Sequence, residues 1–181
     1  MKLMFVCEHN LVRSPVAEAV VADWLRAGGH HELDVCSAGV RAKEGEPVLR
    51  EVLWAASSHH LSVRSHRTQR VDEELVDSCD LVVTMTEDQR GIVNMLAPQA
   101  FARTFTMREL LRLSATIDGP SLDVVTLAAR AHANRPVQAP AAGPEDVADI
   151  TGVTREAVQK VVDEVVVLSR DLTARLGATR A

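Results

Sequence analysis

The sequence of 181 residues contains few aromatic side chains, only 3% of the total, and no tyrosine. Hydrophobic residues nevertheless make up 46% and charged residues 25%, which is the balance of an ordinary globular protein. A chain of this length can bury a hydrophobic core of its own. We therefore expect a single domain over residues 1–181.

Other absences narrow the class of protein. The apolar runs are too short to span a bilayer, and the N-terminal segment lacks the hydrophobic region of a secretory signal. A net charge of −5 argues against a broad nucleic-acid surface. The three cysteines form no C-x-x-C pair, which suits a reducing compartment. The sequence thus predicts a cytoplasmic protein that binds neither membranes nor nucleic acid.

Strand and helix patterns alternate along the chain. The apolar runs predict strands at residues 3–7, 33–38, 80–85 and 103–106. Helical periodicity predicts helices at residues 14–27, 47–57, 71–77, 87–96, 107–113, 122–133 and 154–176. Such alternation is typical of a parallel sheet with helices on both faces. A Pro/Ala-rich segment at 134–146 has no periodicity, and we expect a mobile loop there.

The first predicted strand and helix enclose a short polar loop. Its sequence is Cys7-Glu8-His9-Asn10-Leu11-Val12-Arg13, followed by Ser14-Pro15. Loop N–H groups at the start of a helix form a site for anions. Arg13 can bind two phosphate oxygens with its guanidinium fork. Cys7 lies in the same positive field, so we expect a thiolate that attacks phosphorus.

This C-x5-R-S-P loop near the N-terminus resembles that of the low-molecular-weight protein tyrosine phosphatase family. The resemblance implies a flavodoxin-like α/β fold, a three-layer sandwich with a four-stranded parallel sheet in the order 2-1-3-4. The site would lie at the C-terminal end of the first strand. The activity implied is hydrolysis of a phosphate monoester through a phosphocysteine, without metal or cofactor. Cys7 and Arg13 match the catalytic residues of the family.

The resemblance also implies a set of residues that support the loop. Asn10 would take a positive φ, which asparagine tolerates, and would be braced by Ser37 and His66. Ser14 would cap the helix and offer its hydroxyl to the sulfur of Cys7. Two further loop residues, Glu8 and His9, would stand at the rim of the site.

A phosphatase of this type needs a general acid for the leaving group. The family places it in a D-V-P-D-P segment before the last helix, and Asp149 matches this segment by register. The two flanking prolines are replaced by Ala148 and Ile150. Asp146 remains the alternative acid.

Three departures from the family pattern concern the substrate, and the first is His9, which stands where the family often has glycine. Val12 stands where the family often has a second cysteine, so no disulfide can form inside the loop. The aromatic side chains that stack on phosphotyrosine are missing, and Arg41, Lys43 and Ile150 stand at or beside their places. We therefore expect a phosphorylated small molecule, nucleotide-like or a sugar phosphate, with Arg41 and Lys43 near a second anionic group. A phosphotyrosine protein is the alternative substrate.

Two other functions share parts of this pattern. A non-catalytic phosphate-binding regulatory module would keep Arg13 but would need neither Cys7 nor Asp149. Arsenate reductases share the loop, but they need further cysteines where this chain has Thr86 and Val93. The residues present favour the phosphatase over both.

Overall fold

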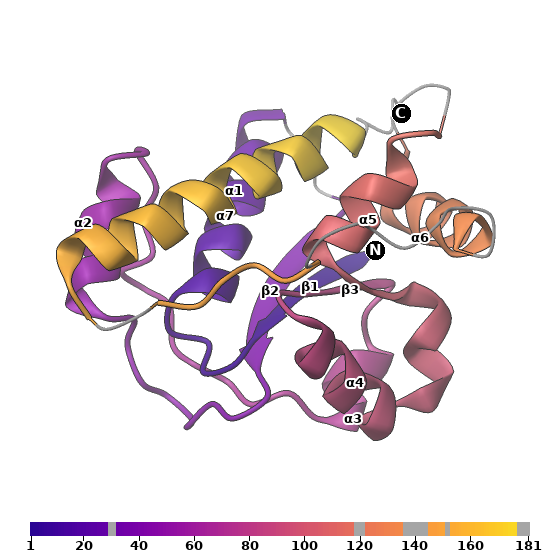
Figure 1. The fold of residues 1–181 in the computed structure, drawn as a ribbon, viewed down its shortest axis with the longest axis horizontal. Helices are drawn as coiled ribbons and strands as arrows, with labels where there is room; N and C mark the ends of the chain where they lie inside the picture. Colours follow the sequence, from indigo (N-terminus) through magenta and orange to yellow (C-terminus); the bar gives the residue numbers. More distant parts are fainter. Residues whose placement is uncertain (29–31, 118–121, 136–144, 151–152, 177–181) are drawn as a thin grey trace.

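Four parallel strands form the sheet at the centre of the molecule. The computed structural model describes residues 1–28, 32–117, 122–135, 145–150 and 153–176. The strands are β1 (Lys2–Cys7), β2 (Asp34–Gly39), β3 (Leu81–Thr84) and β4 (Thr104–Thr106). Their order is β2-β1-β3-β4, and every neighbouring pair is parallel (Figure 1). The expected flavodoxin-like sheet and its order are confirmed.

The expected helices are all found in the described part of the chain. They are α1 (Arg13–Gly28), α2 (Arg50–Ser57), α3 (Glu73–Asp77), α4 (Glu87–Leu96), α5 (Met107–Ser114), α6 (Val124–Asn134) and α7 (Arg155–Arg175). Helix α2 begins three residues later than the expected 47, because Leu49 is still extended, with φ −60° and ψ 146°. A short 3₁₀ helix, η1 (Pro98–Arg103), was not expected, since a single such turn leaves no apolar period.

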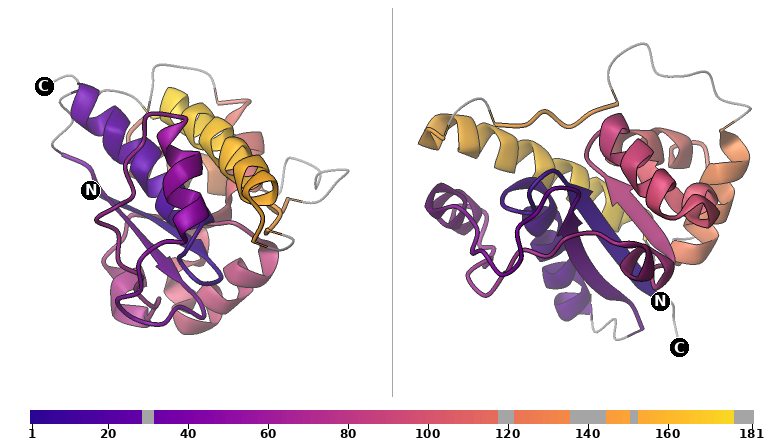
Figure 2. Two further views of the ribbon diagram at one scale, coloured as in Figure 1. Left: turned by 90° about the vertical axis from the view of Figure 1, so that its left-hand side faces the viewer. Right: turned by 90° about the horizontal axis from the view of Figure 1, so that it is seen from below.

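Alternate residues of β1 face two different cores. Leu3 and Phe5 belong to the larger core, which contains side chains of α1, α2, α5, α6 and α7. Met4 and Val6 belong to a smaller core with residues of α3 and α4. This alternation is the period of two that a strand imposes on its side chains. Figures 1 and 2 show the sheet between these two sets of helices.

The last helix covers the larger core. The buried side chains of α7 recur at helical spacing, at Val158, Val161, Val162, Val165, Val166 and Leu172. Thr154 caps its N-terminus, accepting a hydrogen bond from the Ala157 N–H at 3.2 Å. No helix in the described part of the chain is long and apolar enough to cross a membrane.

The segment expected to be mobile, 134–146, falls mostly outside the described residues. Its two ends are described, and both are tied to the body of the protein. Arg135 Nε donates to the Glu109 carboxylate at 2.9 Å. Glu145 pairs with Arg112 at 2.6 Å. The residues just before Asp149 are therefore held in a fixed position.

Candidate active site

The loop between β1 and α1 brings Cys7 and Arg13 together. Cys7 is the last residue of β1 and Arg13 is the first residue of α1. Both side chains are almost fully buried, with 2% of each residue exposed. The sulfur of Cys7 lies 3.0 Å from the Ser14 hydroxyl. The strand end and the helix start thus form one compact polar site.

Asn10 holds the middle of this loop. It adopts a φ of 57° and is completely buried. Its side-chain amide donates to the hydroxyls of Ser14 and Ser37, each at 2.8 Å. Its side-chain oxygen accepts from the Gln69 backbone N–H at 3.0 Å, and its carbonyl lies 3.0 Å from His66 Nε2. The structure therefore brings Ser37 and His66 to Asn10 and adds Gln69.

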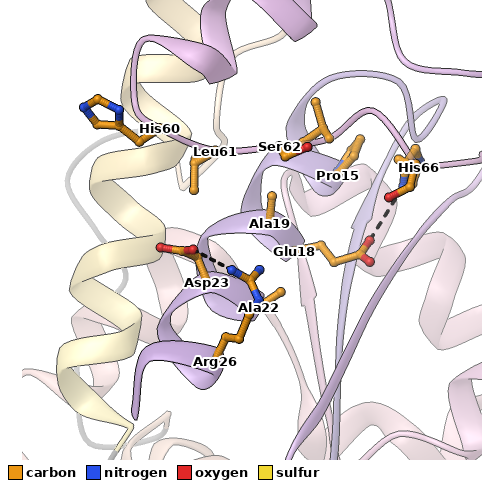
Figure 3. Close-up of a pocket in the computed structure, with 12 residues that line it drawn as sticks. Pro15, Glu18, Ala19, Ala22, Asp23, Arg26, His60, Leu61, Ser62 and His66 are labelled. Carbon is orange, nitrogen blue, oxygen red and sulfur yellow. Dashed lines mark hydrogen bonds and ion pairs between the residues drawn. The ribbon is translucent and has the colours of Figure 1, made fainter. Parts of the chain in front are cut away.

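Glu18 is part of this network, although the sequence reasoning missed it. The Ser37 hydroxyl donates to its carboxylate at 2.6 Å, and His66 Nδ1 lies 3.8 Å from the same oxygen. Figure 3 shows Glu18 on α1 turned toward the ring of His66. Burial raises the pKa of Glu18 despite the Ser37 hydrogen bond, and burial lowers the pKa of His66. The i, i+4 spacing from Ser14 was the available signal, because it puts both residues on one helix face.

The end of β2 packs directly against the loop. A Cβ atom on Gly39 would lie 2.8 Å from the Asn10 nitrogen and 2.9 Å from the Glu8 carbonyl oxygen. Real Cβ atoms do not approach backbone atoms this closely. Glycine is therefore required here because the loop backbone occupies the space of a side chain.

The loop backbone also retains unused donors. Among the described hydrogen bonds, none takes a backbone N–H of residues 8–12 as its donor. These groups lie beside the N-terminus of α1, where the helix dipole adds positive potential. The site therefore has the donors and the field that an anion needs.

The segment before α7 closes the other side of the site. Arg13 donates to the Val147 carbonyl at 3.0 Å and to the Asp149 carboxylate at 2.5 Å. The other Asp149 oxygen accepts from the Ile150 N–H at 2.8 Å. Asp146 points elsewhere, since it accepts from the Glu87 N–H at the start of α4. Of the two candidate acids, only Asp149 contacts Arg13.

A pocket of about 240 Å³ opens above these groups. It is lined by Cys7, His9, Leu11, Val12, Arg13, Leu49, Asp149 and Ile150. Its walls are aliphatic, and His9 supplies the one ring among these lining residues. Leu49 was not expected here, because it comes from the segment before α2 and carries no chemical signal.

Arg41 and Lys43 are not among the residues that line this pocket. The Arg41 guanidinium pairs with Glu8 at 2.9 Å and is 70% exposed. The Arg41 carbonyl lies 3.3 Å from His9 Nδ1. The carbonyl of Lys43 accepts a hydrogen bond from the Thr68 hydroxyl. Arg41 thus contacts the two rim residues of the loop instead of the pocket.

Comparison with known proteins agrees with this fold and loop. The family model described as low molecular weight phosphotyrosine protein phosphatase matches residues 2–124. The chain belongs to this family, and it is a cysteine-dependent phosphatase. The match ends before the segment that carries Asp149, so that residue is placed by the structure.

Some relatives are named protein-arginine-phosphatases and others protein-tyrosine-phosphatases. A protein-arginine-phosphatase of Bacillus subtilis is 31% identical over 109 residues, covering 60% of this chain and 71% of that protein. The tyrosine phosphatase Wzb of Salmonella typhi is 31% identical over 98 residues, covering 54% and 62%. A solved low-molecular-weight tyrosine phosphatase from T. tengcongensis is 25% identical and covers 97% of this chain and 99% of its own, with a TM-score of 0.73.

Proposed function

We propose that this protein hydrolyses a phosphate monoester in two steps through a phosphocysteine on Cys7. The observation that carries the proposal is one pocket lined by Cys7, Arg13 and Asp149. A thiolate, a guanidinium fork and a carboxyl group are the three groups that such a reaction requires.

In the first step the Cys7 thiolate attacks phosphorus and forms an S–P bond. The bond from phosphorus to the ester oxygen breaks, and the leaving oxygen takes a proton from Asp149. Arg13 and the free N–H groups of residues 8–12 stabilise the charge on the equatorial oxygens. The Ser14 hydroxyl, 3.0 Å from the sulfur, stabilises the thiolate before attack and after release.

In the second step water attacks the phosphocysteine. Asp149, now ionised, takes a proton from that water, and the S–P bond breaks to release phosphate and the thiolate. The same carboxyl group therefore acts as acid and then as base. We assign this role to Asp149 over Asp146, because Asp146 is engaged with the N-terminus of α4.

The pocket walls favour a substrate without an aromatic ring next to the phosphate. Leu11, Leu49 and Ile150 offer aliphatic surface, where stacking on a phenyl ring would need aromatic side chains. We propose a phosphorylated small molecule of the sugar-phosphate or nucleotide-like kind. Arg41 and Lys43 would touch only parts of the substrate outside the pocket.

A phosphorylated arginine in a protein is the second candidate. A relative that is 31% identical is named a protein-arginine-phosphatase. The flexible, non-aromatic side chain of arginine also suits aliphatic walls. Other relatives are named tyrosine phosphatases, so phosphotyrosine peptides complete the set of substrates to compare. We place the reaction in a reducing compartment such as the cytoplasm, since all three cysteines are free.

The mechanism is tested by replacing the nucleophile. We expect Cys7→Ser to abolish turnover but to leave phosphate binding intact, because the N–H donors and Arg13 remain. Cys36→Ser is the matched control, since it makes the same change on β2 outside the pocket. Acid quenching of the wild type during turnover should trap one phosphoryl group on Cys7. Full activity of Cys7→Ser would end the covalent mechanism.

The substrate is tested by comparing kcat/KM across three sets of compounds. These are phosphorylated metabolites, phosphoarginine peptides and phosphotyrosine peptides. We expect the highest value for a non-aromatic phosphomonoester. Selective turnover of phosphotyrosine peptides over every other compound would overturn the substrate proposal without touching the mechanism.

A further inference from the structure

Three arginines meet in a second groove beside the active-site pocket. Arg50, Arg64 and Arg155 line it together with Trp54, and its volume is about 590 Å³. Arg50 and Arg155 are the first residues of α2 and α7, and Arg64 comes from the loop after α2. One carboxylate, Glu51, also lines the groove. The groove is therefore a locally positive site on a chain whose net charge is −5.

These arginines differ from those elsewhere in the described structure. Most arginines there form ion pairs, among them Arg26 with Asp23, Arg103 with Asp77 and Arg108 with Glu164. Within the described residues, none of the three arginines in the groove has a carboxylate partner.

Two of these arginines, Arg50 and Arg155, stand in the first turn of a helix. An arginine in the first turn of a helix opposes the helix dipole unless an anion lies nearby, and here Glu51 and Glu156 in the same first turns offset part of this effect. The N-terminus of α2 also has no side-chain cap, since Leu49 makes no capping hydrogen bond. The Val52 and Leu53 N–H groups donate to the Leu49 carbonyl at 3.0 and 3.3 Å, so the backbone donors that adjoin the Arg50 side chain are the N–H groups of residues 50 and 51.

The groove adjoins the pocket through two segments. Leu49 lines the active-site pocket and the next residue, Arg50, lines the groove. Ile150 lines the pocket and lies five positions before Arg155. Figure 1 shows the segment 145–150 running from the sheet toward the end of α7 that lies beside α2. The pocket and the groove are thus neighbours along the chain at residues 49 and 50, and a substrate that occupies both must extend from Cys7 past Leu49 into the groove.

We propose that this groove binds a second phosphate group of the substrate. Guanidinium forks bind phosphate oxygens in pairs, and clusters of arginine are the usual means of recognising such dianions. This inference rests on the proposed function for the reacting phosphate, but it assigns a new site with its own residues. Such a groove favours doubly phosphorylated substrates over simple monophosphates.

Trp54 provides a direct test that does not depend on turnover. The Arg155 guanidinium lies 5.2 Å from the centre of its ring, and Trp24 is the other tryptophan in the chain. In a Trp24→Phe protein the emission therefore reports Trp54. Titration with inorganic pyrophosphate should change this emission saturably. The change should be lost in Arg64→Gln and Arg155→Gln and retained in Arg170→Gln, which removes an exposed charge elsewhere on α7.

Kinetics then connect the groove to catalysis. For a sugar bisphosphate, Arg64→Gln and Arg155→Gln should raise KM roughly tenfold to a hundredfold, the loss typical of a hydrogen bond to a charged group. The KM of p-nitrophenyl phosphate should change much less. Arg170→Gln is again the comparison outside the groove, and its effect on the KM of the bisphosphate should be smaller.

The outcomes separate this inference from the proposed function. Absence of a saturable response of Trp54, or one that survives in both groove variants, would overturn the second phosphate site even if the enzyme hydrolyses monophosphates. Pyrophosphate binding in the groove without any phosphatase activity would instead overturn the proposed function. Equal changes in KM for the sugar bisphosphate and for p-nitrophenyl phosphate would show that the groove does not bind the substrate's second phosphate.

Discussion

At the scale of single residues, the chemistry of the site depends on which acceptor receives the hydrogen of the Ser14 hydroxyl. The Ser14 hydroxyl accepts a hydrogen bond from the Asn10 amide at 2.8 Å. Its single hydrogen is then left for either Cys7 Sγ at 3.0 Å or the Ala38 carbonyl at 3.2 Å. When Cys7 is a thiolate, the stronger acceptor is the sulfur. Asn10 thus orients the hydroxyl toward the atom that we propose as nucleophile.

Asp149 competes with the substrate for Arg13, and this gives a prediction. Asp149→Asn should lower kcat about 10²–10⁴-fold for alkyl phosphates, whose leaving groups need a proton. The loss should be much smaller for p-nitrophenyl phosphate. The same change should tighten inhibition by inorganic phosphate, because a carboxylate 2.5 Å from Arg13 is removed. Steady-state kinetics with product inhibition measure both effects.

Asp146→Asn is the matched control for that experiment. An amide oxygen can still accept from the Glu87 N–H, so we expect little change in kcat for either substrate. If Asp146→Asn shows the leaving-group dependence and Asp149→Asn does not, the assignment of the acid is wrong.

Glu18 gives a prediction about pH. Because burial raises its pKa above the ordinary 4.5, the folded state holds this proton more tightly than the unfolded state. The stability that this provides is complete below pH 4.5 and is lost as pH rises through the raised pKa.

Glu18→Gln removes this titration. The free energy of unfolding of both proteins is measured by urea denaturation from pH 4 to pH 8. The value for Glu18→Gln should increase relative to that of the wild type as pH rises. A constant difference between the two proteins across this range would contradict the prediction.

At the scale of elements, the segment carrying Asp149 is anchored by three different neighbours. The Val147 N–H donates to the Met85 carbonyl after β3 at 2.7 Å, and the Val147 side chain is fully buried. Asp146 binds the start of α4, and Glu145 pairs with Arg112 of α5. These contacts take over the role that two prolines would have in limiting this segment.

The nearby acidic side chains form part of the same anchoring. Carboxylate oxygens of Glu87, Glu109 and Glu145 lie within 4.8 Å of one another. Arginines neutralise them: Arg90 contacts both Glu87 and Glu109, and Arg112 contacts Glu145. We interpret the cluster as an ion-pair network joining α4, α5 and the segment of Asp149.

The contact between β2 and the phosphate-binding loop gives a prediction at this scale. Gly39→Ala should destabilise the protein by roughly 1–3 kcal/mol, the cost of pushing the loop backbone away from β2, and should lower kcat strongly. The reason is the 2.8 Å approach of the new Cβ to the Asn10 nitrogen. Denaturation and kinetics on the same sample measure the two effects.

Gly91→Ala is the matched control. Gly91 lies within α4, and an added Cβ there meets no atom within 4 Å. Alanine should stabilise this exposed helix position by about 0.5–1 kcal/mol, with activity unchanged. An active, stable Gly39→Ala protein would show that the loop can shift without loss of function.

At the scale of the whole molecule, one core connects the site to the last helix. The larger cluster contains Phe5 and Cys7 of β1 and also Val162 and Leu172 of α7. Helix α7 packs on α1, the helix that begins with Arg13. Loss of packing at the far end of α7 therefore weakens the scaffold that holds the loop.

This gives a prediction about stability. Leu172→Ala should lower the free energy of unfolding by about 2–5 kcal/mol, because Leu172 is fully buried. Val167→Ala on the exposed side of α7 should change it by less than about 0.5 kcal/mol. Urea denaturation distinguishes the two. Equal effects would mean that α7 is not part of the cooperative core.

Local features of the sequence were sufficient for the strands, the helices and the central loop, whereas the order of the strands in the sheet was implied by the family resemblance. Apolar alternation and turn residues specify strands and helices over short distances, so the element order and the position of Cys7 and Arg13 could be predicted. The positive φ of Asn10 was implied by the family resemblance, and asparagine is one of the few residue types that tolerate it. The residue at which a helix begins was predicted less well, as for α2, because helix propensity alone does not fix the position of the first turn.

The set of distant residues that share the site follows from tertiary packing. Leu49 and Gln69 reach the pocket or the loop because separate segments pack around one sheet end, and no local pattern encodes such a meeting. Glu18 differs, because its spacing from Ser14 on α1 is a local signal. Packing also determines the place of Arg41, whose charge suggested a role at the pocket but which pairs with Glu8. The chemistry of the loop follows from residues that are neighbours in the sequence, whereas packing between elements brings the other side chains around it, because side-chain contacts depend on distances that the chain order does not contain.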